Sequence, residues 1–105
     1  MKKISLNKTR NVEKIENLPF SEGKIYKLVF KKGSRFYDKE FNSISKEFKF
    51  LKEENFYILK LDNTINKNSR RYRWGKICFM CGKDIFYSDL EYFIGAIEEN
   101  NIWEI

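Results

Sequence analysis

Alternating apolar and polar side chains predict a β-strand in the first third of the chain. The apolar positions of residues 24–32, KIYKLVFKK, that share one face are Tyr26, Leu28 and Phe30. This two-residue period is typical of a strand with one buried face. A turn at 32–34 and an amphipathic stretch at 35–41 then predict a hairpin whose second strand lies at a sheet edge.

Three further apolar segments extend the predicted sheet. Residues 47–52 and 56–62 are expected to form a second hairpin, and apolar side chains on both faces of 56–62 indicate a central strand. Residues 77–81, ICFMC, are apolar at every position and predict a buried strand. With a short strand at residues 1–6, the segments predict an antiparallel sheet of about five strands.

Two helices are expected from periodicity and from end signals. Residues 11–18 have apolar side chains at helical spacing before the only proline, which predicts a short N-terminal helical turn. Ser88 with Glu91 three residues later matches a capping box, and we expect a longer C-terminal helix that stops at Asn100. Its apolar stripe, which would pack on one face of the sheet, consists of Leu90, Phe93, Ile94 and Ile97. The predicted fold is α+β, in a single domain covering residues 1–105.

Composition narrows the functional classes. The chain has 105 residues, of which 42% are hydrophobic and 17% aromatic, so large rings are expected to fill one core. Frequent Lys and Asn indicate an AT-rich genome, and with the small size they suggest a phage or mobile-element accessory protein. Histidine, the commonest general base, is absent, and the glycines are scattered singly, so no phosphate-binding loop is present. We therefore expect a non-catalytic protein.

The net charge of +6 is unevenly distributed. Residues 1–87 contain all 21 Lys and Arg and 10 of the 15 acids, a balance of +11, whereas residues 88–105 contain five acids and no cation, a balance of −5. A basic body suggests a polyanionic partner. A lysine-rich solvated surface with an acidic segment packed on it explains the same charges.

Neither a membrane nor a secretory route is indicated. No apolar run reaches the ~20 residues of a membrane span, and the basic N-terminus lacks the apolar region of a secretory signal. Two cysteines in such a chain favour a reducing compartment, so we expect a cytoplasmic protein without a membrane partner.

Residues 67–76, KNSRRYRWGK, form what we call the basic-aromatic segment. It contains three of the five arginines of a chain that otherwise prefers lysine. Its candidate binding residues are Lys67, Arg70, Arg71, Tyr72, Arg73, Trp74 and Lys76. Because cations meet phosphates and rings stack on unpaired bases, the segment predicts contact with nucleic acid, or with the nucleic-acid channel of a nucleoprotein. Two alternatives are contact with an acidic protein surface and a structural role in which Tyr72 and Trp74 face the core.

The expected C-terminal helix offers a second candidate surface. Its outward acids are Glu91, Glu98 and Glu99. They would bind a basic protein partner, which would make the chain a protein-only inhibitor or an immunity protein.

Two weaker patterns concern metals. Cys78 and Cys81 have the spacing of half a zinc site, but zinc takes four ligands and the chain has no further Cys and no His. We expect two buried apolar thiols, with zinc shared across a dimer or a redox pair as alternatives. Asp38, Glu47 and Lys49 imitate the carboxylate pattern of metal-dependent nucleases, which chance readily produces in a chain rich in Glu and Lys. No metal or cofactor is therefore expected.

Overall fold

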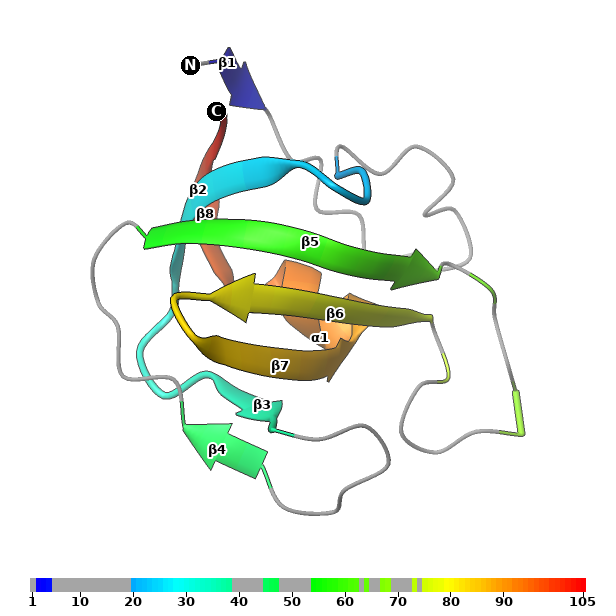
Figure 1. The fold of residues 1–105 in the computed structure, drawn as a ribbon. Helices are drawn as coiled ribbons and strands as arrows, with labels where there is room; N and C mark the ends of the chain where they lie inside the picture. The colour runs from blue at the N-terminus through cyan, green and yellow to red at the C-terminus, as the bar shows by residue number, and fades with distance from the viewer. Residues whose placement is uncertain are drawn as a thin grey trace.

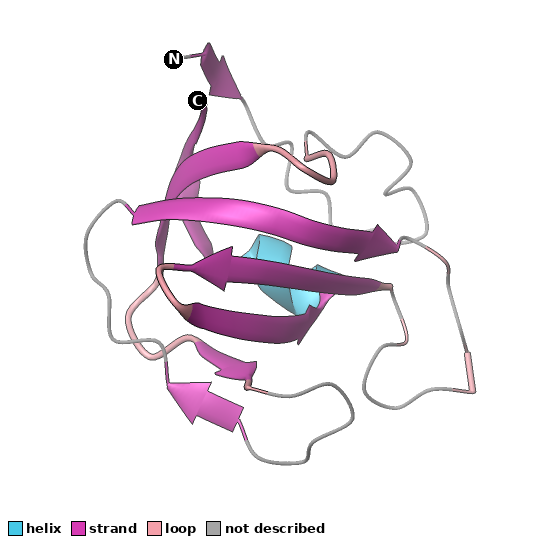
Figure 2. Ribbon diagram, viewed as in Figure 1, coloured by secondary structure: helices cyan, strands magenta, loops and turns pink. Residues whose placement is uncertain are grey.

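The computed structural model describes residues 2–4, 20–38, 45–47, 54–62, 64, 67–68, 73 and 75–105. Within these residues, eight strands and one helix are present (Figure 1, Figure 2). The strands are β1 (Lys2–Ile4), β2 (Ile25–Phe30), β3 (Arg35–Tyr37), β4 (Ser45–Glu47), β5 (Glu54–Asp62), β6 (Lys76–Cys81), β7 (Asp84–Asp89) and β8 (Ile97–Glu104). The helix is α1 (Leu90–Ala96).

The strands form one antiparallel sheet in the order β1-β8-β2-β5-β6-β7-β3-β4. The sheet curls into a half-barrel, and α1 lies behind β6 and β7 in the view of Figure 1. The predicted α+β class is confirmed, as is the central position of β5. The prediction of about five strands is wrong, because it left out β7 and assigned the first residues of β8 to the helix.

The predicted hairpin between residues 24–32 and 35–41 is wrong. Of the second predicted hairpin, residues 48–52 lie outside the described residues, and β5 pairs with β2 and β6. The turn at 32–34 is present, with Gly33 at φ 84° and the Ser34 hydroxyl donating to the Lys31 carbonyl at 2.6 Å. Beyond it, however, β2 pairs with β5 and β8, whereas β3 pairs with β4 and β7. The turn therefore leads the chain to another part of the sheet. The expected helical turn at 11–18 lies outside the described residues.

Aromatic rings fill the core, as the composition predicts. Phe79 is completely buried, and its ring centroid lies 5.2–5.9 Å from five others. These five neighbours are Phe30, Phe36, Phe56, Phe86 and Phe93. Because they come from four strands and α1, their contacts join β2 to β3 across the concave side of the half-barrel.

Helix α1 is shorter than the sequence predicts and begins one residue later. The Asp89 carboxylate accepts hydrogen bonds from the backbone N–H of Glu91 at 2.8 Å and of Tyr92 at 3.3 Å, so Asp89 is the N-cap in place of Ser88. The helix ends at Ala96 because Ile97 is extended and pairs with Phe30 of β2. The predicted continuation to Asn100 is therefore wrong.

Removal of the Asp89 cap is expected to destabilise the protein. Asp89→Ala is expected to lower the free energy of unfolding by about 1 kcal/mol, because two N–H groups at the helix start lose their acceptor. Urea denaturation followed by circular dichroism measures the loss. Asp89→Asn keeps an oxygen acceptor and should lose much less. An equal loss in both variants would show that the negative charge matters and the cap does not.

Candidate nucleic-acid interface

The basic-aromatic segment connects the end of β5 to the start of β6. Lys67 and Arg73 are exposed, and Lys76, the first residue of β6, is partly exposed. Gly75 is buried, and its carbonyl accepts a hydrogen bond from the Leu90 backbone N–H at 3.1 Å, which fixes the end of the segment beside α1. The segment's other predicted residues lie outside the described residues, and their roles stay predictions: Arg70, Arg71, Tyr72 and Trp74.

Charged side chains alternate across the sheet at the base of the segment. The register pairs Asp62 of β5 with Lys76 of β6, and Lys76 with Asp89 of β7. Asp62 accepts a hydrogen bond from the Thr64 backbone N–H at 2.8 Å. That hydrogen bond, and to a smaller degree the charges of Lys76 and Lys60, lower the pKa of Asp62. The lowered pKa favours the ionised form of the Asp62 carboxylate.

The sheet has an outer face, which we define as the face directed away from the aromatic core. Alternation along each strand separates it from the inner face, because neighbours of buried core residues project outward. One row across β2, β5, β6 and β7 contains Ile25, Tyr57, Met80 and Ile85. A second row across β5, β6, β7 and β3 contains Lys60, Cys78, Tyr87 and Tyr37. Directly opposed side chains in such rows lie about 5 Å apart, so each row is a continuous surface.

The outer face continues to the β1 edge. Trp103 of β8 lies between Lys3 of β1 and Lys27 of β2 in the register. The Lys3 ammonium lies 5.5 Å from the centroid of the Trp103 ring, a cation–π contact that places both on one face. The outer face therefore combines cations and rings from separate strands, a combination that the sequence analysis missed. Only the strand register reveals that these residues share a face.

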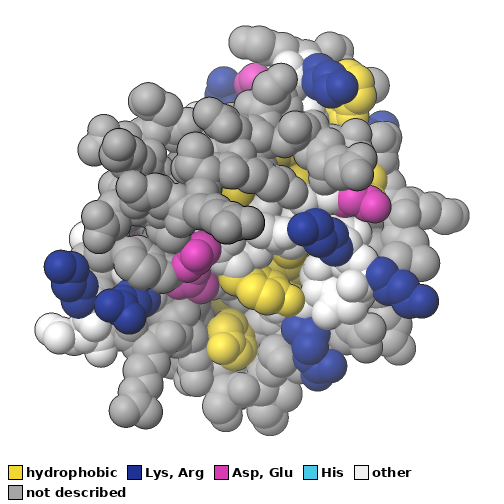
Figure 3. Space-filling model, turned by 180° about the vertical axis from the view of Figure 1, so that it is seen from behind, with side chains coloured by type: hydrophobic (Ala, Val, Ile, Leu, Met, Phe, Trp, Pro, Cys, Tyr) yellow, Lys and Arg dark blue, Asp and Glu magenta, His cyan; other side chains and the backbone are white. Residues whose placement is uncertain are grey.

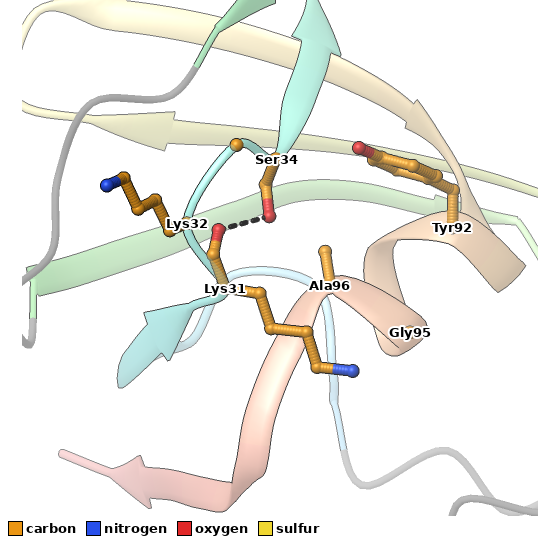
Figure 4. A pocket seen from close by; sticks show the side chains of 7 residues that line it. Lys31, Lys32, Ser34, Tyr92, Gly95 and Ala96 are labelled. Atoms are coloured by element: carbon orange, nitrogen blue, oxygen red, sulfur yellow. Dashed lines mark hydrogen bonds between the residues drawn. The ribbon is translucent and has the colours of Figure 1, made fainter.

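The opposite side of the molecule also carries charged and apolar side chains among the described residues. Seen from behind, cationic, acidic and apolar side chains are interspersed (Figure 3). A hollow of about 360 Å³ lies between α1 and the turn after β2, and it is lined by Lys31, Lys32, Gly33, Ser34, Tyr92, Gly95 and Ala96. In Figure 4 the Lys32 side chain points away from it, and the Ser34 hydroxyl is bonded to the Lys31 carbonyl. The Tyr92 hydroxyl accepts from the Arg35 backbone N–H at 2.9 Å. The hollow thus offers fewer rings and cations than the outer face.

The predicted acidic helix face is not one helix face. Glu91 is exposed in the first turn of α1, where partial burial and the Asp89 carboxylate raise its pKa. Glu98 and Glu99 belong to β8, in the stretch where the register shifts between the pairs Phe30–Ile97 and Leu28–Ile102. That placement corrects the expectation that all three acids line the helix. Whether Glu91, Glu98 and Glu99 bind a partner stays a prediction.

The two cysteines lie on opposite faces of β6. Cys81 belongs to the core cluster, whereas Cys78 stands outside it, between Lys60 and Tyr87 in the register. Residues three apart in a strand project to opposite sides, so the two thiols do not converge on one ion. Both are 7% exposed, and the prediction of buried thiols in a strand is confirmed.

The nuclease-like carboxylates are not side by side in the register. Glu47 of β4 is opposite Arg35 of β3, and Asp38 follows three residues further along. That offset corresponds to about 10 Å along the ladder. Lys49 lies outside the described residues.

The chain matches no protein-family model, no curated protein sequence and no solved structure. Among the described residues, no helix is both long and apolar enough to cross a membrane.

Proposed function

We propose that the protein is a small non-catalytic module that binds nucleic acid through the basic-aromatic segment. The observation that carries the proposal is the gathering of cations at one end of β5 and β6. Lys67 and Arg73 are exposed there, and the neighbouring strand ends contribute Lys60 and Lys76. Four cations in this arrangement suit a backbone of phosphates, which arginine and lysine contact without regard to sequence.

The biological use that fits such a module is an accessory or inhibitory role beside a nucleic-acid enzyme. It would occupy either the nucleic acid itself or the channel of a nucleoprotein that normally holds it. The rival function, a protein-only inhibitor that uses an acidic helix, gains no support from the fold, because Glu98 and Glu99 lie in β8.

Salt dependence tests the proposal. The affinity of the protein for a labelled single-stranded oligonucleotide, measured by fluorescence anisotropy, is expected to fall steeply between about 50 and 200 mM salt. Replacing Arg70, Arg71 and Arg73 together by alanine should reduce the slope of log affinity against log salt by about 2, since each lost phosphate contact removes ~0.7.

A matched variant controls for the loss of net charge. Lys31, Lys32 and Lys83 are exposed in turns away from the segment, and replacing all three by alanine removes the same charge. This control should keep most of the slope. Equal losses in the two variants, or no binding by the wild-type protein at low salt, would refute the proposed function.

A further inference from the structure

The outer face carries partly exposed rings that do not belong to the core cluster. Tyr57 lies between Ile25 and Met80 in the register, and its hydroxyl is 3.7 Å from where a β-carbon on Gly23 would stand. The Tyr57 ring therefore extends over the turn before β2. Tyr87 lies in the next row, between Cys78 and Tyr37. Both rings are only half-buried.

Exposed aliphatic side chains surround these rings. Ile25 and Ile85 are each 41% exposed at the two ends of the Tyr57 row, and Leu59 of β5 is 37% exposed. Single exposed aliphatic residues are common on proteins, but here they adjoin two tyrosines on the same face. The arrangement offers a broad apolar platform to a flat partner.

Cations border the platform on both sides. Lys27 of β2 lies in the row beyond Tyr57, and Lys60 of β5 lies in the Tyr87 row. Lys76 follows at the base of the basic-aromatic segment, in a row with Asp62 and Asp89. Rings between cations suit a ligand that alternates planar groups with negative charges.

We infer that the outer face binds single-stranded nucleic acid, with unpaired bases stacked on Tyr57 and Tyr87 and phosphates beside Lys27 and Lys60. Strand β6 separates the two tyrosines, and the register offsets them by two residues, so they stand about 12 Å apart and accept different bases. A duplex hides the faces of its bases, whereas a single strand presents them to rings. This inference rests on the proposed function and adds the form of nucleic acid that is bound.

Ring substitutions test the inference. Tyr57→Leu and Tyr87→Leu keep an apolar side chain but remove the stacking surface, so each should weaken binding of a single-stranded oligonucleotide by about 5- to 150-fold. The salt slope should stay unchanged, because no phosphate contact is lost. Tyr92→Leu is the matched control: Tyr92 is 45% exposed on α1, behind the sheet, and its loss should leave affinity unchanged.

The unaltered protein supplies a second measurement that does not depend on the folding of a variant. Ultraviolet crosslinking to a uracil-rich single strand should yield crosslinked peptides that contain Tyr57 or Tyr87, and the wild-type protein should prefer the single strand to a duplex of the same sequence. Crosslinks confined to residues 67–76, or equal affinity for duplex and single strand, would overturn the inference. In that case a steep salt slope would still support the proposed function, whereas absence of any binding at low salt would end both.

Discussion

Phe79→Ala is expected to remove a large part of the stability of the protein. The ring of Phe79 is completely buried and has five aromatic neighbours. Truncation of a buried phenylalanine lowers the free energy of unfolding by about 3–5 kcal/mol, through lost burial and the cavity left behind. A domain of this size is typically stable by about 5–15 kcal/mol, so the variant should lose a large fraction of its stability.

Urea denaturation with circular dichroism measures this loss, and two variants serve as comparisons. Phe79→Leu keeps much of the buried apolar volume and should lose distinctly less than the alanine variant. Tyr92→Ala also removes a ring that contacts Phe36, but the Tyr92 side chain is 45% exposed, so its loss should be small. Similar losses for Phe79→Ala and Tyr92→Ala would contradict the central position of Phe79 in the core.

Strands with a regular pattern are predictable from this sequence, and strands with broken patterns are not. Strand β2 alternates cleanly and β6 is apolar throughout, so local burial identifies both. Strand β7 begins and ends with aspartate and runs directly into the signals of a helix start. Strand β8 has polar residues at 98–101, between the two parts that pair with β2. Ile97, the first residue of β8, therefore has helical spacing with the apolar residues of α1, although it pairs in the sheet.

Strand partners depend on contacts that no local pattern contains. The turn at 32–34 has the residues of a hairpin, yet β3 pairs with β4 and β7. The rings of Phe30 and Phe36 nevertheless lie 4.8 Å apart, on either side of that turn. The curl of the sheet brings them together as core side chains, while their backbones join different neighbours. Both rings are buried in the common core, and their burial does not require β2 to pair with β3.

In the candidate interface, too, some features have a local sequence pattern and others depend on strand pairing. The cations of residues 67–76 are contiguous, so composition alone singles them out. Tyr57 and Tyr87 come from strands separated by β6, and nothing near either residue indicates the other. The register pairs Tyr57 with Met80, and Cys78 with Tyr87. These pairs place the outward residues of β5, β6 and β7 on one continuous surface.

Gly75→Ala is expected to destabilise the protein and to weaken nucleic-acid binding. Gly75 has φ 105°, a backbone conformation that is strained for any residue with a β-carbon. Residues forced into such conformations cost about 1–3 kcal/mol in the free energy of unfolding. Gly75 is also buried, and its carbonyl accepts the hydrogen bond from Leu90. A shift that relieves the strain would move the end of the basic-aromatic segment relative to β6 and α1.

Gly95→Ala is the natural comparison, because it makes the same chemical change at an unstrained position. Gly95 lies in α1, and a β-carbon there would meet no atom within 4 Å. Alanine in a helix is favoured over glycine by about 1 kcal/mol, so this variant should gain stability. Urea denaturation should thus shift in opposite directions for the two glycine variants. Oligonucleotide affinity, measured where both are folded, should fall for Gly75→Ala and stay unchanged for Gly95→Ala. If Gly75→Ala binds like the wild-type protein, the exit of the segment does not set the position of its phosphate contacts.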